Sequence, residues 1–151
     1  MHTCLFCSFV TGEKPCHRIW EDKDHLAFLT IFPNTPGFTV VIPKRHYPSY
    51  VFDMPAAALT ALIAASRAVV RLLDRAFDDV GRTALVFEGF SIDHVHAKLI
   101  PLHGSRQEEW RPILSDAQPF SERYEGFITT HDGPRADDAW LAQLAERIRN
   151  A

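Results

Sequence analysis

The 151-residue sequence contains few cysteines, no long uninterrupted apolar run and no large excess of either charge. Its three cysteines are an odd number, which excludes the fully paired disulfide framework of small secreted domains. The N-terminus lacks the basic stretch and apolar run of a secretory signal. The longest apolar region, around 59–73, is interrupted by Arg67 and Arg71, so we expect no membrane-spanning helix. We therefore expect a cytoplasmic protein with reduced thiols.

The charges nearly balance, because 16 lysines and arginines against 19 aspartates and glutamates give a net charge of -3. A mildly acidic chain is a poor candidate for general binding to nucleic acids or anionic membranes, but it is compatible with a local pocket for a small anion. The hydrophobic fraction of 46% and the charged fraction of 23% are ordinary for a soluble globular protein. The length predicts one domain over 1–151.

Short β-branched and apolar runs predict three strands in the N-terminal half, over 17–21, 26–31 and 38–43. Apolar residues that recur with a 3.6-residue period from Leu59 to Phe77 predict one long helix. The helix is expected to begin near Pro55, which suits a first helical turn, and to end by Asp79 or Gly81.

Two further strands, over 83–88 and 95–101, are separated by a short connection and are predicted to form an antiparallel hairpin. Residues 1–16 contain Gly12 and Pro15 and are expected to form a loop.

Beyond a core over 1–104, residues 105–151 are expected to form an extension with a strand over 124–130 and a helix that opens at Asp137-Asp138. This order of elements predicts an α+β domain: an antiparallel sheet of five to six strands, one long helix and a C-terminal helix.

The most informative pattern lies in residues 94–98, at the start of the second strand of the predicted hairpin. On a strand His94, His96 and Lys98 point to one face, and the apolar residues between them point to the other. One interpretation is a solvated polar face of an antiparallel sheet. The other is a site in which one histidine is a nucleophile or metal ligand and its neighbours orient it.

Cys4 and Cys7 form a Cys-x-x-Cys pair, a spacing that lets two thiolates bind one tetrahedral metal ion. His46 and His94 are candidates for the two further ligands. A redox pair is the alternative, but redox pairs usually lie at a strand-to-helix junction of a βαβ unit, which this sequence does not predict. Cys16 has no partner at metal spacing and is expected to be a free thiol.

The segment His94-Val95-His96-Ala97-Lys98-Leu99-Ile100 resembles the His-φ-His-φ-His-φ-φ motif of the histidine triad (HIT) superfamily, in which φ is apolar. The N-terminal half resembles the same family in the order of its short motifs: Cys4-Leu5-Phe6-Cys7, Trp20-Glu21-Asp22, Ala27-Phe28-Leu29, Pro36-Gly37 and Val41-Ile42-Pro43-Lys44-Arg45-His46. The resemblance extends from about Cys4 to His103, and it implies a HIT-like fold.

The resemblance also implies a chemistry. Family enzymes hydrolyse or transfer a nucleoside phosphate ester or anhydride, such as a dinucleoside polyphosphate or a nucleoside phosphoramidate, through a covalent nucleotidyl-histidine, which maps to His96. In the zinc-bearing branches the metal ligands map to Cys4, Cys7, His46 and His94. The family further implies a homodimer that joins its two sheets.

Three features differ from the family pattern. Lys98 stands at the third histidine, where its charge can stabilise phosphoryl oxygens although an amine is a poor general acid at neutral pH. The position that contacts the ribose in many members falls near Thr30 or Ile31, and neither side chain suits that role. The loop before the triad is short, and Glu88 or Ser91 is expected to replace part of its contacts with the substrate.

His103 lies just past the predicted strand, where it is expected to bind substrate as the missing third imidazole or to replace His94 on the metal; a solvated loop histidine is the alternative. Arg106 and Trp110 are candidates to contact a nucleotide by charge and stacking. Two other functions stay open. One is a zinc-stabilised nucleotide-binding module with little or no turnover, and the other is a protein in which zinc has only a structural role.

Overall fold

A computed structural model of the chain describes residues 4–129, 136 and 139–141. They belong to two compact units, Met1–Glu109 and Trp110–Ala151. The first unit contains all the strands among the described residues, which form one antiparallel sheet. The α+β fold predicted from the sequence is confirmed, whereas one domain over 1–151 with a core over 1–104 stays a prediction.

The second unit differs from the prediction. Residues 124–129 form no strand, and Gly126 has a φ of 94°, a left-handed value that interrupts an extended chain. The predicted strand over 124–130 is therefore wrong for its described residues, and Thr130 lies outside them. Residues 139–141 are helical, and the remainder of the predicted C-terminal helix lies outside the described residues.

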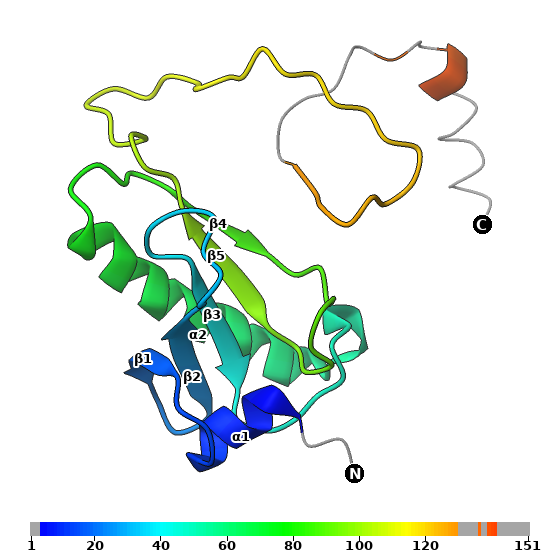
Figure 1. The fold of residues 1–151 in the computed structure, drawn as a ribbon. Coiled ribbons are helices and arrows are strands. Elements are labelled where there is room, and N and C mark those ends of the chain that lie inside the picture. Colours follow the sequence, from blue (N-terminus) through cyan, green and yellow to red (C-terminus); the bar gives the residue numbers. More distant parts are fainter. Residues whose placement is uncertain (1–3, 130–135, 137–138, 142–151) are drawn as a thin grey trace. The chain divides into compact units, whose positions relative to one another are not determined.

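Five strands form the sheet in the order β1-β2-β3-β5-β4 (Figure 1). They are β1 (His17–Glu21), β2 (His25–Leu29), β3 (Thr39–Pro43), β4 (Thr83–Val86) and β5 (Ala97–Pro101). The predicted hairpin is present, since β4 pairs with β5 in antiparallel register. Both strands are shorter than predicted at the hairpin end, so residues 87–96 form the connection, which carries His94 and His96.

The N-terminal segment, predicted as a loop, contains helix α1 (Leu5–Thr11). Gly12 follows it with a left-handed φ of 78°, a common way to end a helix. The ring of Phe6 packs edge-on against Phe28 of β2, with 5.4 Å between centroids. A helix this short is unstable alone, so tertiary packing stabilises it, and that packing leaves no periodic signal in a seven-residue segment.

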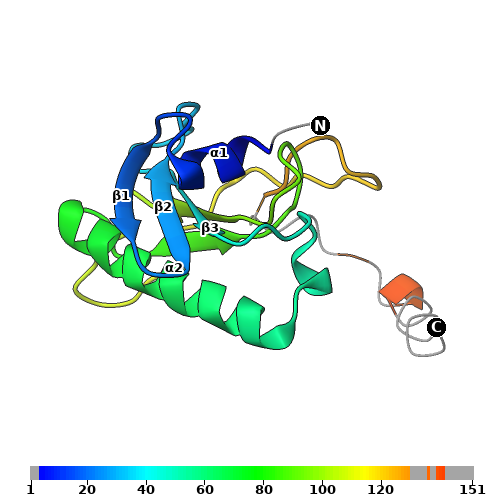
Figure 2. The same ribbon diagram turned by 90° about the horizontal axis from the view of Figure 1, so that it is seen from below.

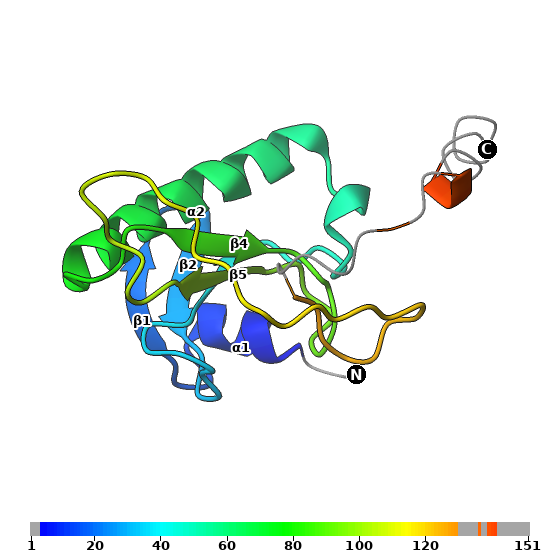
Figure 3. The ribbon, with the colours of Figure 1, turned by 90° about the horizontal axis from the view of Figure 1, so that it is seen from above.

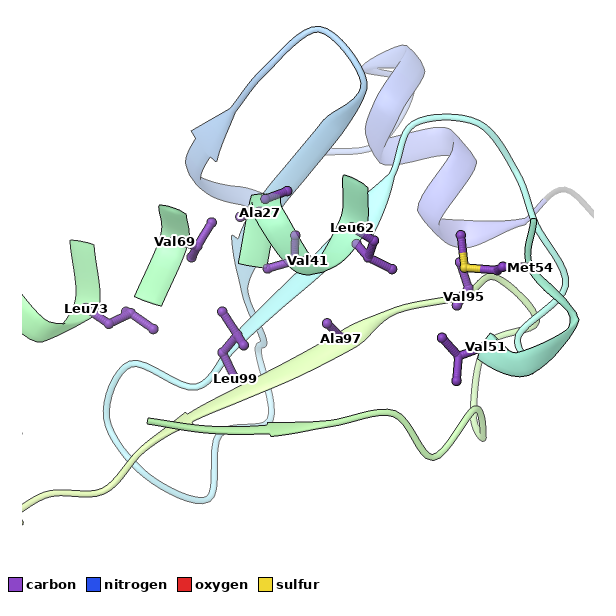
Figure 4. Close-up of a cluster of buried hydrophobic side chains, with 11 residues drawn as sticks. Ala27, Val41, Val51, Met54, Leu62, Val69, Leu73, Val95, Ala97 and Leu99 are labelled. Atoms are coloured by element: carbon purple, nitrogen blue, oxygen red, sulfur yellow. The ribbon is translucent and has the colours of Figure 1, made fainter. Parts of the chain in front are cut away.

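The long predicted helix is present as α2 (Ala56–Ala76), after the 3-10 turn η1 (Val51–Asp53). It lies on the opposite face of the sheet from α1 (Figure 2 and Figure 3). The core between α2 and the sheet is built from small and branched side chains (Figure 4): Leu62, Val69 and Leu73 from α2, and Ala27, Val41, Ala97 and Leu99 from the sheet. By length and composition alone α2 is apolar enough to cross a membrane, but its buried side makes it a core helix of this unit.

The face of the sheet opposite α2 is covered by α1 over β2 and β3, where Phe6 packs on Leu26, Phe28, Val40 and Ile42. Residues of β5 alternate between the two faces, and Lys98 is paired with Val40 on the α1 side. Lys98 is only partly buried. The candidate site lies on this side of the sheet.

Candidate functional site

Four side chains predicted as metal ligands converge at the N-terminal end of β5. The ligand atoms of Cys4, Cys7, His46 and His94 all lie within 4.8 Å of one another. The Nδ1 atom of His94 is 3.4 Å from the Cys4 sulfur and 3.6 Å from the Cys7 sulfur, and Nδ1 of His46 is 3.5 Å from the Cys7 sulfur. Zinc–sulfur bonds of about 2.3 Å and zinc–nitrogen bonds of about 2.0–2.1 Å in a tetrahedron require nitrogen–sulfur separations of about 3.6 Å. The four donors therefore fit a tetrahedral ion.

Local structure explains why these residues meet. Cys4 is the residue before α1 and Cys7 lies one turn later, so both thiols are on the same side of the helix. His46 follows β3, and His94 lies in the connection before β5. The cluster therefore joins α1 to the ends of two neighbouring strands.

The protonation of His94 suits a ligand. Its Nε2–H donates to the carbonyl of Pro43 at 2.9 Å, which leaves the lone pair of Nδ1 toward the two sulfurs. Burial lowers the pKa of this histidine and favours the neutral ring. Burial and the adjacent Cys4 thiol raise the pKa of Cys7, so two thiolates here need a cation beside them. This donor set fits a metal ion.

His96 lies two residues beyond the metal cluster and is 4% exposed. Its Nδ1–H donates to the carbonyl of His94 at 2.7 Å, and the ring of Phe6 packs edge-on against it at 5.4 Å. Burial lowers the pKa of His96. The result is a neutral imidazole with a fixed tautomer, whose Nε2 keeps its lone pair.

Lys98 is the next residue of the motif on the same face as His96. Its ammonium forms an ion pair with the carboxylate of Glu88, and the two side chains are 24% and 14% exposed. Burial lowers the pKa of Lys98. The structure thus brings together two residues that the sequence suggested separately, one as a catalytic group and one as a substrate contact.

His103 lies at the other end of β5, against expectation. Its Nδ1 is 3.1 Å from the carboxylate of Asp79, and its Nε2 is 2.9 Å from the carbonyl of Pro36. These acceptors raise its pKa. The five residues of β5 lie between it and His96, and they span about 16 Å at roughly 3.3 Å per residue. The metal cluster therefore forms from Cys4, Cys7, His46 and His94 without His103, and the contact of His103 with substrate stays a prediction.

Ser91 is exposed and has a φ of 77°, in the left-handed region. The connection around it is anchored to the segment after β3, because the backbone N–H of Ser49 donates to Asp93 at 2.8 Å. A Cβ at Gly89 would approach the Ser49 carbonyl to 3.0 Å, so the two segments pass closely. The structure places Ser91 in the connection that carries the site, and its contact with substrate stays a prediction.

Arg106 and Trp110 lie in different units, and the contact of Trp110 with a nucleotide stays a prediction. The Arg106 guanidinium donates to the carbonyls of Asp74 at 2.7 Å and Val80 at 2.8 Å, which caps the end of α2. Trp110 belongs to the second unit and is 72% exposed. Arg106 is therefore a structural residue of the first unit.

Sequence reasoning missed three groups that hold the histidines in place. The carbonyls of Pro43 and His94 fix two tautomers, and the ring of Phe6 supports His96. The carbonyls could not be predicted from the sequence, because every residue has a backbone carbonyl. Phe6 could have been noticed, because it is one of two apolar residues enclosed by the cysteine pair.

Known proteins share this arrangement of sequence and fold. The family model of the HIT domain matches residues 11–105. An uncharacterized HIT-like protein of Methanocaldococcus jannaschii, MJ0866, is 36% identical over 105 residues, which cover 65% of this chain and 78% of the relative. The crystal structure of SMU.412c from Streptococcus mutans UA159 superimposes with a TM-score of 0.68 at 30% identity, covering 99% of this chain and 85% of that chain.

Two further relatives have names that refer to an activity. The adenosine 5'-monophosphoramidase hnt1 of Schizosaccharomyces pombe is 33% identical, over 66% of this chain and 74% of that protein. The adenylylsulfatase HINT3 of Arabidopsis thaliana is 29% identical, over 65% of this chain and 51% of that protein. Family membership supports a nucleotide hydrolase in broad terms. On its family-model match, its relatives and its fold, this chain belongs to the HIT domain family.

Proposed function

We propose that this protein hydrolyses or transfers a nucleoside phosphate ester or anhydride through a covalent nucleotidyl-histidine on His96. The observation that carries the proposal is the 2.7 Å hydrogen bond from Nδ1–H of His96 to the carbonyl of His94. It leaves Nε2 as the nucleophilic nitrogen, and burial keeps the ring neutral at physiological pH. The relatives named as a phosphoramidase and an adenylylsulfatase support an adenosine nucleotide as the first substrate to test.

The first experiment is intact-mass detection of the adduct after rapid mixing with the p-nitrophenyl ester of AMP, whose leaving group departs without assistance. Wild type is expected to gain one adenylyl group, and His96→Ala to gain none. His17→Ala is the matched control, because His17 is exposed on β1. A wild-type protein without the adduct, or an adduct that survives in His96→Ala, would refute the proposal.

We propose zinc as the ion of the cysteine–histidine cluster, because two sulfur and two nitrogen donors in a tetrahedral arrangement suit zinc. When bound, the ion would stabilise both thiolates and hold His94, whose carbonyl orients His96. This role is structural, and the ion need not contact substrate. Metal analysis of the purified protein tests it: about one zinc per chain is expected, and Cys7→Ser is expected to lose it.

A nucleotide-binding module with little or no turnover is the second candidate, favoured by Lys98 at the third triad position. Restoring the family residue with Lys98→His separates the two. If wild type binds a nucleotide but hydrolyses it only after this substitution, the second candidate is correct. Measurable turnover by wild type contradicts it.

We further propose a homodimer. β4 lies at one edge of the sheet, where strand pairing with a second copy is geometrically simple. Leu85 of β4 and Ile63 of α2 are 39% and 43% exposed and would be covered in such a dimer. Light scattering is expected to give twice the chain mass, and Leu85→Glu to give the monomer mass; a wild-type monomer would refute the dimer. A cytoplasmic location stays a prediction for cell fractionation.

A further inference from the structure

Lys98 and Glu88 form their ion pair on the side of the sheet that carries His96. The register pairs Val86 of β4 with Lys98 of β5, and residues two apart in a strand share a face. Glu88 lies two residues beyond Val86, where the chain leaves β4 in the direction that leads from Lys98 back along β5 toward His96. Because the ammonium contacts the Glu88 carboxylate, it is drawn along the sheet toward the nucleophile.

The ion pair makes Lys98 a fixed positive charge. Both side chains are more than three-quarters buried, so their attraction is screened less than at an open surface. Loss of the Lys98 proton would leave the Glu88 carboxylate without this cation. Burial lowers the pKa of Lys98, and the carboxylate in contact with it favours the charged amine. Lys98 is therefore suited to stabilise negative charge and poorly suited to donate a proton.

Nucleotide bonds that are cleaved at phosphorus differ in what their leaving groups require. The oxygen of a phosphoanhydride leaves as a stable oxyanion, which a nearby positive charge stabilises. The nitrogen of a phosphoramidate leaves as an amine only when it receives a proton, which requires a general acid. A histidine at position 98 would supply that proton near neutral pH. The lysine present there supplies charge instead.

We propose that the Lys98–Glu88 pair makes this protein selective for nucleoside phosphoanhydrides over nucleoside phosphoramidates. The inference rests on the nucleotidyl transfer to His96 proposed above. Lys98 acts on the leaving oxygen, and Glu88 is a positioning residue that holds the ammonium near it.

The chemical steps balance without a further reactant. Nε2 of neutral His96 attacks the phosphorus, an N–P bond forms, and the P–O bond to the leaving phosphate breaks with its electron pair on the oxygen beside Lys98. Water then attacks the same phosphorus, the N–P bond breaks with its electron pair returned to Nε2, and the proton of water passes to solvent. His96 is neutral before and after the cycle.

The test compares single-turnover rates of three probes: diadenosine triphosphate, adenosine 5'-phosphoramidate and the p-nitrophenyl ester of AMP. Lys98→Met removes the charge, Lys98→Arg keeps it with little ability to donate a proton, and Lys98→His introduces a general acid. Lys23→Met, on an exposed residue between β1 and β2, is the matched control. Retained zinc and unchanged thermal unfolding establish that each variant is folded.

Wild type is expected to cleave the anhydride at least about 100-fold faster than the phosphoramidate, since one charge-stabilising group contributes about 10²–10³ in rate. Lys98→Met is expected to lose most of this ratio, Lys98→Arg to keep it, and Lys98→His to reverse it or reduce it at least tenfold. Equal slowing of both substrates in Lys98→Met, or loss of the preference in Lys98→Arg, would overturn the inference while the adduct from the p-nitrophenyl ester persists. Absence of that adduct in wild type would refute the proposed function, and the inference with it.

Discussion

The two ends of strand β5 both carry histidines, but their surroundings give these rings opposite properties. Before β5, His96 is buried and donates one ring N–H to a carbonyl, and burial lowers its pKa. After β5, His103 lies between Asp79 and the carbonyl of Pro36, and these acceptors raise its pKa. Burial favours the neutral form of His96 with a free lone pair, whereas the two acceptors around His103 favour the form that donates from both ring nitrogens. The atoms around each histidine therefore determine whether it can act as a nucleophile or only stabilises the fold.

The largest expected effect is a difference in hydrolysis rate between variants at the two ends of β5. His96→Ala removes the proposed nucleophile and is expected to lower the hydrolysis rate by about 10³-fold or more, as for loss of a catalytic nucleophile elsewhere. His103→Ala removes only interactions that join the end of α2 to the β2–β3 connection, so its rate is expected to stay within about threefold of wild type. Steady-state kinetics check both, and similar losses would break the comparison.

Removal of the metal from the cysteine–histidine cluster before β5 is expected to lower the stability of the fold. A ligand present at about 1,000 times its dissociation constant stabilises a fold by about 4 kcal/mol, which corresponds to roughly 10 °C in melting temperature for a chain of this size. Chelation or Cys7→Ser is therefore expected to lower the melting temperature by about that amount. Cys16→Ser is the control, because Cys16 packs near Phe6 outside the ligand cluster. An unchanged melting temperature after confirmed metal loss would contradict a bracing role.

The pH dependence of stability is expected to depend on His103 and Asp79, which interact after the end of β5. His103 has a folded pKa above its ordinary 6.5, so its contribution is complete below about pH 6 and is lost as the pH rises through the raised value. Asp79 has a folded pKa below its ordinary 3.8, so its contribution is present above that value and is lost as the pH falls through the lowered one. The two contributions overlap in mildly acidic solution.

Asp79→Asn is therefore expected to destabilise the protein most near pH 5–6 and progressively less toward pH 9. Denaturant unfolding across this range measures the difference from wild type. Asp78→Asn serves as the control because Asp78 is an exposed neighbour. A constant difference at all pH values would show that the charged His103–Asp79 pair is not the cause.

The smallest expected effect concerns a buried polar group that, unlike both histidines, lacks a hydrogen-bond partner among the described residues. The hydroxyl of Ser66 on α2 is fully buried and has no hydrogen-bond partner among the described residues. Ser66→Ala removes an unpaired polar atom and is expected to stabilise the protein by about 1 kcal/mol. Ser8→Ala is expected to destabilise it, since the buried Ser8 hydroxyl donates to the carbonyl of Leu5 at 2.7 Å. Thermal unfolding distinguishes the two signs, and a loss of stability in Ser66→Ala would contradict this account.

Much of the fold followed from local patterns. The 3.6-residue period gave α2, and the β-branched runs gave the five strands of the sheet, because burial of one face leaves a periodic record in the sequence. The short helix α1 left no such record, since seven residues followed by Gly12 and Pro15 resemble a loop. The predicted strand over 124–130 shows the reverse case, where apolar residues without a neighbouring strand stay irregular.

Some residues of the site could likewise be predicted from the sequence, and others could not. The four donor residues could be selected from type and spacing, because few residue types bind a tetrahedral ion. The position of His103 could not be predicted, because its closeness to His96 in sequence does not reveal that β5 carries the chain to the far end of the strand. The Lys98–Glu88 pair depends on the register between β4 and β5, and the sequence alone does not specify that register.

The most direct test of the central claim is nitrogen-15 and phosphorus-31 NMR of histidine-labelled protein before and after reaction with the p-nitrophenyl ester of AMP. The hydrogen bond to the His94 carbonyl predicts a neutral His96 with the proton on Nδ1, and a phosphorus coupled to Nε2 of the same residue in the adduct. A phosphorus attached to Nδ1 of His96, or to any other histidine, would contradict the account.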